Sequence, residues 1–413
     1  MTDAADAFFA EWDRRGPGAK RSIERAGLLV HALSAGTAGT PLLTVVGSKG
    51  KGTAATYASA VLAAAGCRVV TVTSPALREE RERIRVDGAA ISETDLAGLG
   101  GHIREAIGSL PERHSGEGYL SPSGLFTIAG VLHARAVGAD VIVLEAGMGG
   151  VSDEVSLFAP DVVGLTEVFA EHVGVLGGSP AEIAANKAGV TAATTSAVVS
   201  LPQSSPVTEA IASTVAYRTG GSVKPEVIGT TGTPVGLMPT GHGRRNAELG
   251  RVAAERLLDV TGRSRPSQDR LNRVLSSVRL PGRLSRHRVP GTGTTLLIDS
   301  AIDRSGAATA LTEAYGRWDR IDHVLVCLPD HKDVSGVVAG LADLPVTYIR
   351  MPRYRHLRFT HPVPAHWTIM DDTELSREHL ASLGEQVLAL GTVYFIGRLL
   401  ELAASETERL FEV

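Results

Sequence analysis

A glycine-rich segment that carries two lysines is the clearest place for chemistry in this chain. It reads Gly-Ser-Lys-Gly-Lys-Gly-Thr at residues 47–53 and follows the apolar run 41–46. Glycines let backbone N–H groups approach phosphate oxygens, and a helix that starts at such a loop favours the anion. Lys51 supplies a mobile positive charge, and Thr53 can ligate Mg²⁺. The segment predicts a nucleotide-phosphate loop; the alternative is a glycine-rich turn in an ordinary α/β protein.

Three further polar residues lie at or beyond the ends of apolar runs, namely Ser74, Glu145 and His172. Hydroxyl, carboxylate and imidazole groups at the ends of strands are ligands that a divalent cation beside a nucleotide accepts. The alternative for Glu145 is a strand-end residue in a salt bridge. For Lys187, which lies in a helical stretch, the alternative is an exposed surface lysine.

Short apolar runs that alternate with alanine-rich stretches predict how these residues are positioned. Such alternation is typical of parallel strands joined by crossover helices. The expected strands are 41–46, 68–73, 140–145 and 161–166, and the expected helices are 53–65, 93–107 and 123–137. Together they predict a doubly wound α/β core.

A second α/β domain is expected after Leu280. Pro281 and Gly282 interrupt the pattern there, and the alternation restarts at 294–299. Further strands are expected at 324–328, 346–349 and 393–396. We therefore predict one domain at residues 1–283, which carries the phosphate loop, and a smaller α/β domain at 284–413. The stretch 220–241, rich in Gly, Thr and Pro, predicts a long surface loop or a small β-excursion.

Composition excludes several classes of protein. The 413 residues carry 41 Lys and Arg against 45 Asp and Glu, and no basic run suggests a nucleic-acid surface. No apolar stretch approaches the ~18 residues that span a membrane, and the acidic segment 1–15 does not resemble a secretory signal. Cys67 and Cys327 are expected to be buried, reduced thiols. We expect a cytoplasmic protein, monomeric or homodimeric, with small-molecule partners and neither nucleic-acid nor membrane partners.

The phosphate loop resembles the Gly-Thr-Asn-Gly-Lys-Gly-Ser loop of the folylpolyglutamate synthase family, within the Mur ligase superfamily. Four later segments of the first half resemble motifs of that family in order and spacing. They are Thr-Ser-Pro-Ala-Leu at 73–77, Leu-Glu-Ala-Gly-Met-Gly-Gly at 144–150, Glu-His-Val-Gly-Val-Leu-Gly at 171–177 and Asn-Lys-Ala-Gly-Val at 186–190. Order and spacing together are stronger evidence than any one motif.

The second half continues the resemblance, which covers nearly the whole chain. The matching segments are His-Gly-Arg-Arg-Asn-Ala at 242–247, Leu-Pro-Gly-Arg at 280–283, Asp-Ser-Ala-Ile-Asp at 299–303 and Gly-Thr-Val-Tyr-Phe-Ile-Gly at 391–397. The resemblance implies a Mur-ligase-like α/β fold, with a large P-loop domain that has a doubly wound parallel sheet and a smaller C-terminal Rossmann-like α/β domain.

The resemblance also implies roles for individual residues. ATP would contact Gly47, Ser48, Lys49, Gly50, Lys51, Gly52, Thr53, Asn246, Arg283 and Asp299. Thr53 and Glu145 would hold one Mg²⁺, and Ser74, His172 and Glu145 a second. Lys187 would be open to carbamylation, which turns a cation into a carboxylate-like group. The catalytic residues would be Lys51, Glu145, His172, Lys187 and Arg283, with Arg283 clamping phosphate, Asn246 touching adenine and Asp299 contacting ribose.

Several positions inside the matched motifs depart from the family. Ala76 stands where the motif has His, Gly124 where it has Glu and Val151 where it has Arg. Other departures are Val155, Ser156, Gly243, Ile302 and Asp303. Losing a hydrogen-bond partner of a charged group costs ~1.5–3 kcal/mol. These departures predict a substrate other than folate, while the phosphate, metal and Lys187 positions match.

The sequence therefore predicts an ATP-dependent ligase for biosynthesis that forms an amide bond. A carboxylate would be activated as an acyl phosphate and attacked by the amine of glutamate or another amino acid, with ATP and Mg²⁺ as cofactors. The acid would be a folate or, as the departures favour, another acid of specialised metabolism. The alternative is a degenerate paralogue that binds nucleotide without catalysis and serves as a partner or regulatory subunit. A kinase or simple NTPase fits less well, because Gly52 separates Lys51 from Thr53.

Overall fold

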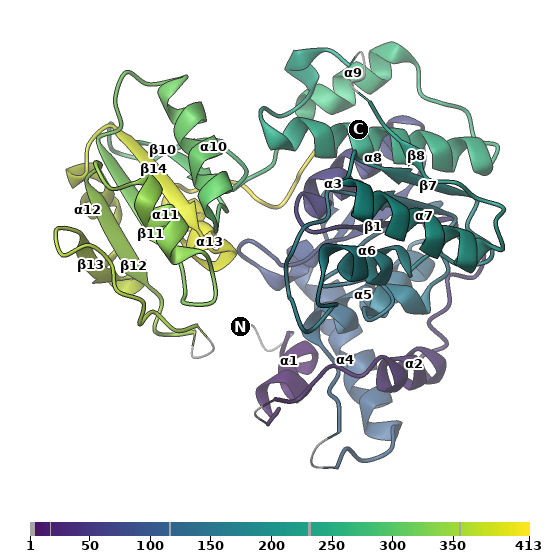
Figure 1. The fold of residues 1–413 in the computed structure, drawn as a ribbon. Coiled ribbons are helices and arrows are strands. Elements are labelled where there is room, and N and C mark those ends of the chain that lie inside the picture. Colours follow the sequence, from purple (N-terminus) through teal and green to yellow (C-terminus); the bar gives the residue numbers. More distant parts are fainter. Residues whose placement is uncertain (1–4, 17, 115–116, 230–232, 355–356) are drawn as a thin grey trace. The chain divides into compact units, whose positions relative to one another are not determined.

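The chain forms two compact units (Figure 1). The computed structural model describes residues 5–16, 18–114, 117–229, 233–354 and 357–413. The first unit contains residues 1–76, 80–279 and 408–413, and the second contains 77–79 and 280–407. The chain therefore passes between the units more than once. The division into domains at residues 1–283 and 284–413 stays a prediction.

The first unit is built on an eight-stranded sheet with the order β4-β3-β2-β5-β1-β6-β7-β8. Its strands are β1 (Leu42–Val46), β2 (Val69–Val72), β3 (Ile84–Val86), β4 (Ala89–Ala90), β5 (Val141–Glu145), β6 (Val162–Leu165), β7 (Ala197–Ser200) and β8 (Glu226–Val227). Neighbours from β2 to β8 are parallel, and β3 and β4 form an antiparallel edge. The predicted parallel α/β core is present.

Helices cover both faces of this sheet. They are α1 (Asp6–Asp13), α2 (Ile23–Ala32), α3 (Lys51–Ala64), α4 (Glu93–Ser109), α5 (Pro122–Ala136), α6 (Pro180–Ala188), α7 (Ser205–Thr219), α8 (His242–Val260) and α9 (Gln268–Ser277). Helix α3 contacts β1, β2 and β5, and α8 packs along α3 and contacts β1, β6 and β7. Helices α1, α2 and α4 to α7 contribute to the core cluster on the other face. Three-residue and four-residue 3-10 turns lie at Glu80–Arg83, Glu154–Leu157 and Val235–Leu237.

The carboxyl ends of β1, β5 and β6 lie side by side. The register pairs Val45 of β1 with Glu145 of β5, and Val46 of β1 with Leu165 of β6. Strand β1 is central, and its crossover through α3 leads to β2 beyond β5, so the order of strands reverses beside β1. Ligands of open α/β sheets bind at such reversals. The loops that follow these three strands therefore share one edge of the sheet.

The second unit has a six-stranded sheet with the order β13-β12-β11-β14-β10-β9. The strands are β9 (Ser285–Arg288), β10 (Thr295–Asp299), β11 (His323–Cys327), β12 (Val346–Arg350), β13 (Thr368–Asp371) and β14 (Gln386–Gly391). Only β9 is antiparallel among the paired strands of this sheet, within the part of the unit that the structure describes. The helices are α10 (Arg304–Tyr315), α11 (Val334–Gly340), α12 (Arg377–Ser382) and α13 (Val393–Leu402), with a 3-10 turn at Asp372–Glu374.

One predicted strand is wrong. The segment 393–396 begins helix α13, and the strand of this region is β14, which ends just before it. The run Val-Tyr-Phe-Ile has high strand propensity, which explains the prediction. The buried residues Phe395, Ile396, Leu399 and Leu400 follow helical spacing, however, so burial along one helix face overrides propensity.

The remaining elements agree with their predictions within a few residues at each end. The stretch 220–241 contains both β8 and a 3-10 turn, and residues 230–232 lie outside the described part. Cys67 and Cys327 are buried and free, as expected. Among the described residues, no helix is long and apolar enough to cross a membrane.

Helix α3 is buried almost all round, because it lies between the sheet and α8. Gly250 of α8 permits this approach: a Cβ atom there would lie 2.1 Å from the carbonyl oxygen of Ala54. Gly250→Ala is therefore expected to lower the free energy of unfolding by ~1–3 kcal/mol, as overpacking does. Urea denaturation followed by circular dichroism measures the change.

Gly98→Ala is the matched control, because Gly98 lies in α4 and a Cβ atom there meets nothing within 4 Å. This exchange is expected to be neutral or to stabilise by up to ~1 kcal/mol. Equal losses in both variants would contradict the close packing of α8 on α3.

Candidate functional site

Glycine is required at two places in the phosphate loop. Gly47 has φ +137°, and a Cβ atom there would lie 1.9 Å from Oγ1 of Thr166. Gly50 has φ +82°, and a Cβ atom there would lie 2.2 Å from the amide group of Asn246. Side chains rarely adopt such backbone angles, and here they would also collide. The loop is therefore packed between the segment after β6 and helix α8, with Asn246 against it.

Lys51 is the first residue of α3, directly after Gly50. Its ammonium group donates to the carbonyl oxygens of Gly47 at 3.1 Å and Ser48 at 3.2 Å, so the side chain folds back over the loop. Ser48 fixes the loop to the neighbouring segment, because its Oγ accepts the N–H of Phe169 at 3.2 Å. A cation and the free N–H groups of a helix start thus meet at one turn, which suits phosphate.

Glu145 ends β5 and is buried, with 7% of its surface exposed. Its Oε2 accepts the N–H of Ser74 at 3.0 Å. A Cβ atom at Gly52 would lie 3.4 Å from the same oxygen, so the carboxylate adjoins the start of α3. Thr53, the next residue, is 5% exposed. The structure therefore brings the start of α3, which carries Thr53, together with the strand-end residues Ser74 and Glu145.

Lys187 is buried completely, with 0% of its surface exposed, which excludes the alternative of a surface lysine. Its Nζ donates to the carbonyl oxygen of Gly47 at 2.7 Å and to Oε1 of Glu171 at 2.9 Å. Burial lowers the pKa of Lys187, the charge of Lys51 lowers it further, and Glu171 opposes both effects. Lys187 therefore joins α6, the phosphate loop and the segment that contains His172.

His172 lies next to Glu171 in the segment between β6 and α6. Its backbone has φ +49°, and its carbonyl oxygen accepts the N–H groups of Val175 at 2.9 Å and Leu176 at 3.1 Å. The residue thus sits at a tight turn. Lys187 fixes this turn relative to Gly47 through Glu171.

The second unit holds the other two predicted residues. Asp299 ends β10, and its Oδ2 accepts the N–H of Leu284, the residue after Arg283, at 2.8 Å. Ser300 donates its N–H to the carbonyl oxygen of Gly282 at 3.0 Å. Arg283 is exposed. These bonds place Arg283 and Asp299 side by side within the second unit.

The residues present fit a hard cation held by oxygen. Among the described residues, no group of three or more His, Cys, Asp and Glu side chains is arranged to hold a metal. The predicted set contains only Glu145 and His172 of these types and relies on the hydroxyl groups of Thr53 and Ser74. Mg²⁺ accepts such a sparse set, because it keeps several waters and binds substrate phosphates.

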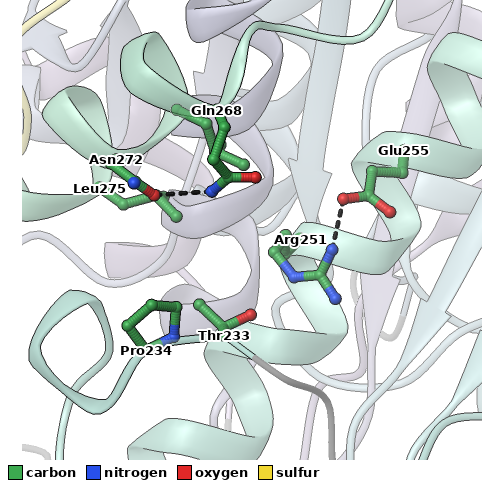
Figure 2. Close-up of a pocket in the computed structure, with 8 residues that line it drawn as sticks. Thr233, Pro234, Arg251, Glu255, Gln268, Asn272 and Leu275 are labelled. Atoms are coloured by element: carbon green, nitrogen blue, oxygen red, sulfur yellow. Dashed lines mark hydrogen bonds and ion pairs between the residues drawn. The ribbon is translucent and has the colours of Figure 1, made fainter.

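A hollow of about 490 Å³ lies elsewhere in the first unit, between α8 and α9 (Figure 2). Its lining includes Arg251 and Glu255, which are paired with each other, and Gln268, which donates to Asn272 at 2.7 Å. None of the predicted site residues lines it. We therefore assign the site by the polar geometry at the sheet edge rather than by this hollow.

Sequence reasoning missed several residues that support the site. Glu171 holds Lys187, and Asn186 accepts the N–H of Gly150 at 3.1 Å through Oδ1. Asp153 accepts the N–H of Met148 at 2.8 Å and pairs with Arg21. The adjacent acidic residues Asp153 and Glu154 just after a Gly-Gly pair were a visible signal. Arg21 gave none, because it is distant in sequence.

No family model matches the chain. A probable bifunctional folylpolyglutamate synthase/dihydropteroate synthase of Halobacterium salinarum is 28% identical over 88% of this chain and 44% of its own length. A corresponding protein of Haloferax volcanii is 38% identical over 37% of this chain and 18% of its own length. The chain thus spans less than half the length of these two relatives.

Three further matches cover more of both chains. The dihydrofolate synthase/folylpolyglutamate synthase of Mycobacterium tuberculosis is 26% identical over 80% of this chain and 75% of its own length. The structure of the folylpolyglutamate synthase of that organism, complexed with ADP and AMPPCP, superposes with a TM-score of 0.78 at 21% identity, over 98% of this chain and 100% of that one. The apo form of the L. casei enzyme gives a TM-score of 0.78 at 21% identity, over 96% and 98%. Such structural likeness confirms the predicted fold of two α/β units, which is the fold of these folylpolyglutamate synthase structures.

Proposed function

We propose that this protein is an ATP-dependent ligase that activates a carboxylate as an acyl phosphate and joins it to an amine. The observation that carries the proposal is the meeting of Lys51, Glu145 and Ser74 at one edge of the sheet. A cation over a glycine loop binds phosphates, and a buried carboxylate beside it suits their metal ion. Curated relatives named folylpolyglutamate synthase and a relative's structure with AMPPCP support this reading.

The reaction divides into two displacements. A carboxylate oxygen of the acid attacks the γ-phosphorus of ATP, and ADP leaves. The amine nitrogen then attacks the acyl carbon, phosphate leaves, and the nitrogen loses a proton. Lys51 would bind the transferred phosphoryl group during the first step and stabilise the charge that develops on it.

We also propose which residues bind Mg²⁺. Thr53 and Glu145 would hold one Mg²⁺, and Ser74, His172 and Glu145 a second. An ion held by these residues would supply charge neutralisation at the phosphates. The bond from Ser74 N–H to Glu145 fixes the carboxylate before any ion binds, which supports this assignment.

The acid substrate is proposed to be other than folate. The departures at Ala76 and Val151 remove an imidazole and a guanidinium from motifs that otherwise match. Val151 now leaves an apolar side chain 46% exposed next to the Gly-Gly turn. A site that binds its substrate by hydrogen bonds and loses several of these partners favours a different acid.

Hydroxylamine tests the activation step directly, because it traps acyl phosphates whatever the natural amine. Protein, ATP, Mg²⁺, hydroxylamine and a panel of carboxylic acids are incubated, and hydroxamates are identified by mass. Lys51→Ala and Glu145→Ala are each expected to reduce trapping by at least ~100-fold, since each removes charge stabilisation of the phosphoryl group. Circular dichroism checks that both variants fold.

Lys224→Ala and Glu209→Ala are matched controls, because both residues are exposed in the first unit. They are expected to trap acyl phosphate as the wild type does. Full activity in both site variants would show that the site is misplaced. Nucleotide binding without any hydroxamate across the panel would favour the non-catalytic paralogue instead.

Carbamylation of Lys187, which the resemblance implies, also stays a prediction. The neutral amine is the form that adds CO2, and burial, which lowers the pKa of Lys187, favours that form. The Glu171 carboxylate at 2.9 Å favours the cation. Protein equilibrated with isotopically labelled bicarbonate is expected to show a carbamate carbon by NMR that Lys187→Met lacks. A wild-type spectrum without this signal contradicts the modification.

The same residue is expected to contribute to stability. Lys187→Met leaves the Glu171 carboxylate facing the Gly47 carbonyl oxygen, so the free energy of unfolding should fall by ~1–3 kcal/mol. The estimate is modest because the Glu171 side chain is 20% exposed. Urea denaturation measures it, and Lys187→Met/Glu171→Gln should recover part of the loss. A double variant less stable than the single one would refute the ion pair.

A further inference from the structure

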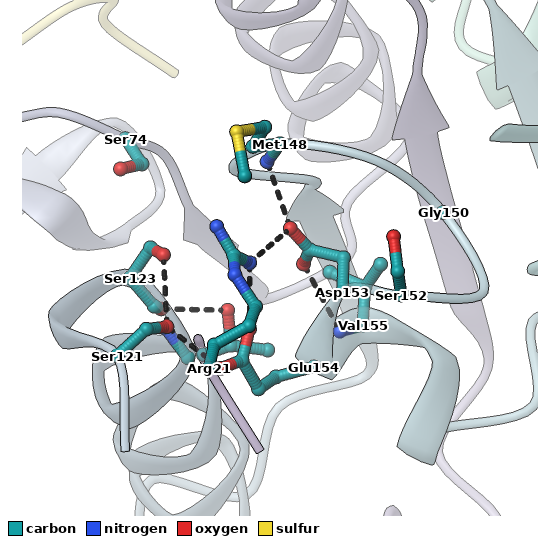
Figure 3. A network of polar contacts seen from close by, with 12 residues as sticks. Arg21, Ser74, Ser121, Ser123, Met148, Gly150, Ser152, Asp153, Glu154 and Val155 are labelled. Carbon is teal, nitrogen blue, oxygen red and sulfur yellow. Dashed lines mark hydrogen bonds and ion pairs between the residues drawn. The ribbon is translucent and has the colours of Figure 1, made fainter. Parts of the chain in front are cut away.

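Two acidic residues are buried beside the candidate site, although no predicted role uses them. Asp153 and Glu154 are each 1% exposed, and both accept from Nη1 of Arg21, at 3.0 Å and 3.1 Å (Figure 3). Arg21 lies just before α2, and the acidic pair follows the turn after β5. Segments distant in sequence thus meet in one buried network.

The network holds two carboxyl groups on one guanidinium group. Burial raises the pKa of Glu154, and the neighbouring Asp153 raises it further, against the effect of Arg21. Ser121, the N-cap of α5, donates its hydroxyl to Oε1 of Glu154 at 2.6 Å. The Glu154 carboxyl group is therefore bound inside the protein, by Arg21 and by Ser121. A buried carboxyl group fixed in this way positions its neighbours.

The Glu154 carboxyl group fills the space that a side chain at position 124 would occupy. A Cβ atom at Gly124 would lie 2.1 Å from Cδ of Glu154 and 2.4 Å from its Oε1. Gly124 is in the first turn of α5, where its N–H donates to Oγ of Ser121 at 3.0 Å. Any side chain at position 124 would therefore collide with the carboxyl group. Glu154 thus supplies the carboxyl group in this space, and glycine at position 124 leaves room for it.

This network is joined to the segment that leaves Glu145. Oδ2 of Asp153, which also binds Arg21, accepts the N–H of Met148 at 2.8 Å. A Cβ atom at Gly147 would lie 3.0 Å from Oγ of Ser123 and 3.4 Å from Oδ2 of Asp153, so the segment packs closely on the network. The end of β5 is thereby fixed from outside the nucleotide loop.

We propose that Glu154 is a positioning residue, whose buried carboxyl group takes the space of a side chain at position 124 and, through Arg21 and Asp153, fixes the segment after Glu145. Position 124 and position 154 are then a reciprocal pair, in which one residue carries the carboxyl group and the other is small. The effect on Glu145 rests on the proposed function, whereas the shared space does not.

A double-mutant cycle tests the shared space by thermal unfolding. Gly124→Glu alone places a Cβ atom and a third carboxylate against Glu154, so its Tm should fall by ~5 °C or more. Gly124→Glu/Glu154→Ala should regain at least half of that loss. Additive effects of the two exchanges overturn the shared space. If Gly124→Glu does not fold, Gly124→Ala, which adds only the colliding carbon, replaces it in the cycle.

Calorimetry with a non-hydrolysable ATP analogue, with and without Mg²⁺, tests the positioning. The ratio of the Kd without Mg²⁺ to the Kd with Mg²⁺ reports how well Glu145 is presented to the ion. Glu154→Ala is expected to reduce this ratio by ~3-fold to 10-fold, and the double variant should restore it to within ~2-fold of the wild type. A coupled Tm cycle with an unchanged ratio in Glu154→Ala overturns the positioning role.

Thr195→Val is the matched control, because Thr195 is buried and bonds to the carbonyl oxygen of Pro160 near the start of β6, at the opposite edge of the sheet. It should lower Tm and leave the Mg²⁺ ratio unchanged; a fall in the ratio here too would reduce the effect of Glu154→Ala to general destabilisation and overturn the proposal. A wild type that does not bind the analogue overturns the proposed function and the positioning role together, while the Tm cycle still decides the shared space.

Discussion

The ammonium group of Lys187, buried against the carbonyl oxygen of Gly47 and the carboxylate of Glu171, is the contact on which the candidate site depends. It is the point where α6, the phosphate loop and the segment with His172 meet. A buried ammonium group needs partners, because isolated charge is costly inside a protein. Through its two acceptors, Lys187 therefore fixes the phosphate loop and the segment with His172 relative to each other.

The same carbonyl oxygen of Gly47 also accepts from Lys51, so two ammonium groups converge on one atom. Their repulsion contributes to the lowered pKa of Lys187, after burial. Glu171 balances one of the two charges. The second charge and the N–H groups at the start of α3 suit a phosphate anion, which would draw Lys51 away from Gly47 and relieve the repulsion. The electrostatics of the loop alone thus favour a bound polyphosphate.

Prediction from sequence succeeded where a local pattern determines the structure. The strand before Gly47 and the position of Glu145 follow from short apolar runs. The tight loop at Gly47 and Gly50 follows from the glycine-rich motif. The segment 393–396 was predicted wrongly because strand propensity and helical burial conflict there, and tertiary packing decided. The burial of Lys187 and the pairing of Arg21 with Asp153 and Glu154 depend on contacts between distant segments. No local pattern carries that information.

The departure at position 124 changes meaning once the structure is considered. In the sequence alone, Gly124 is a lost carboxylate, and several such losses suggest a weakened site. In the fold, a carboxyl group is present in the same space, delivered by Glu154 and neutralised in part by Arg21. The Lys51, Glu145 and Lys187 contacts are intact as well, and together they support the proposed ligase rather than a non-catalytic paralogue.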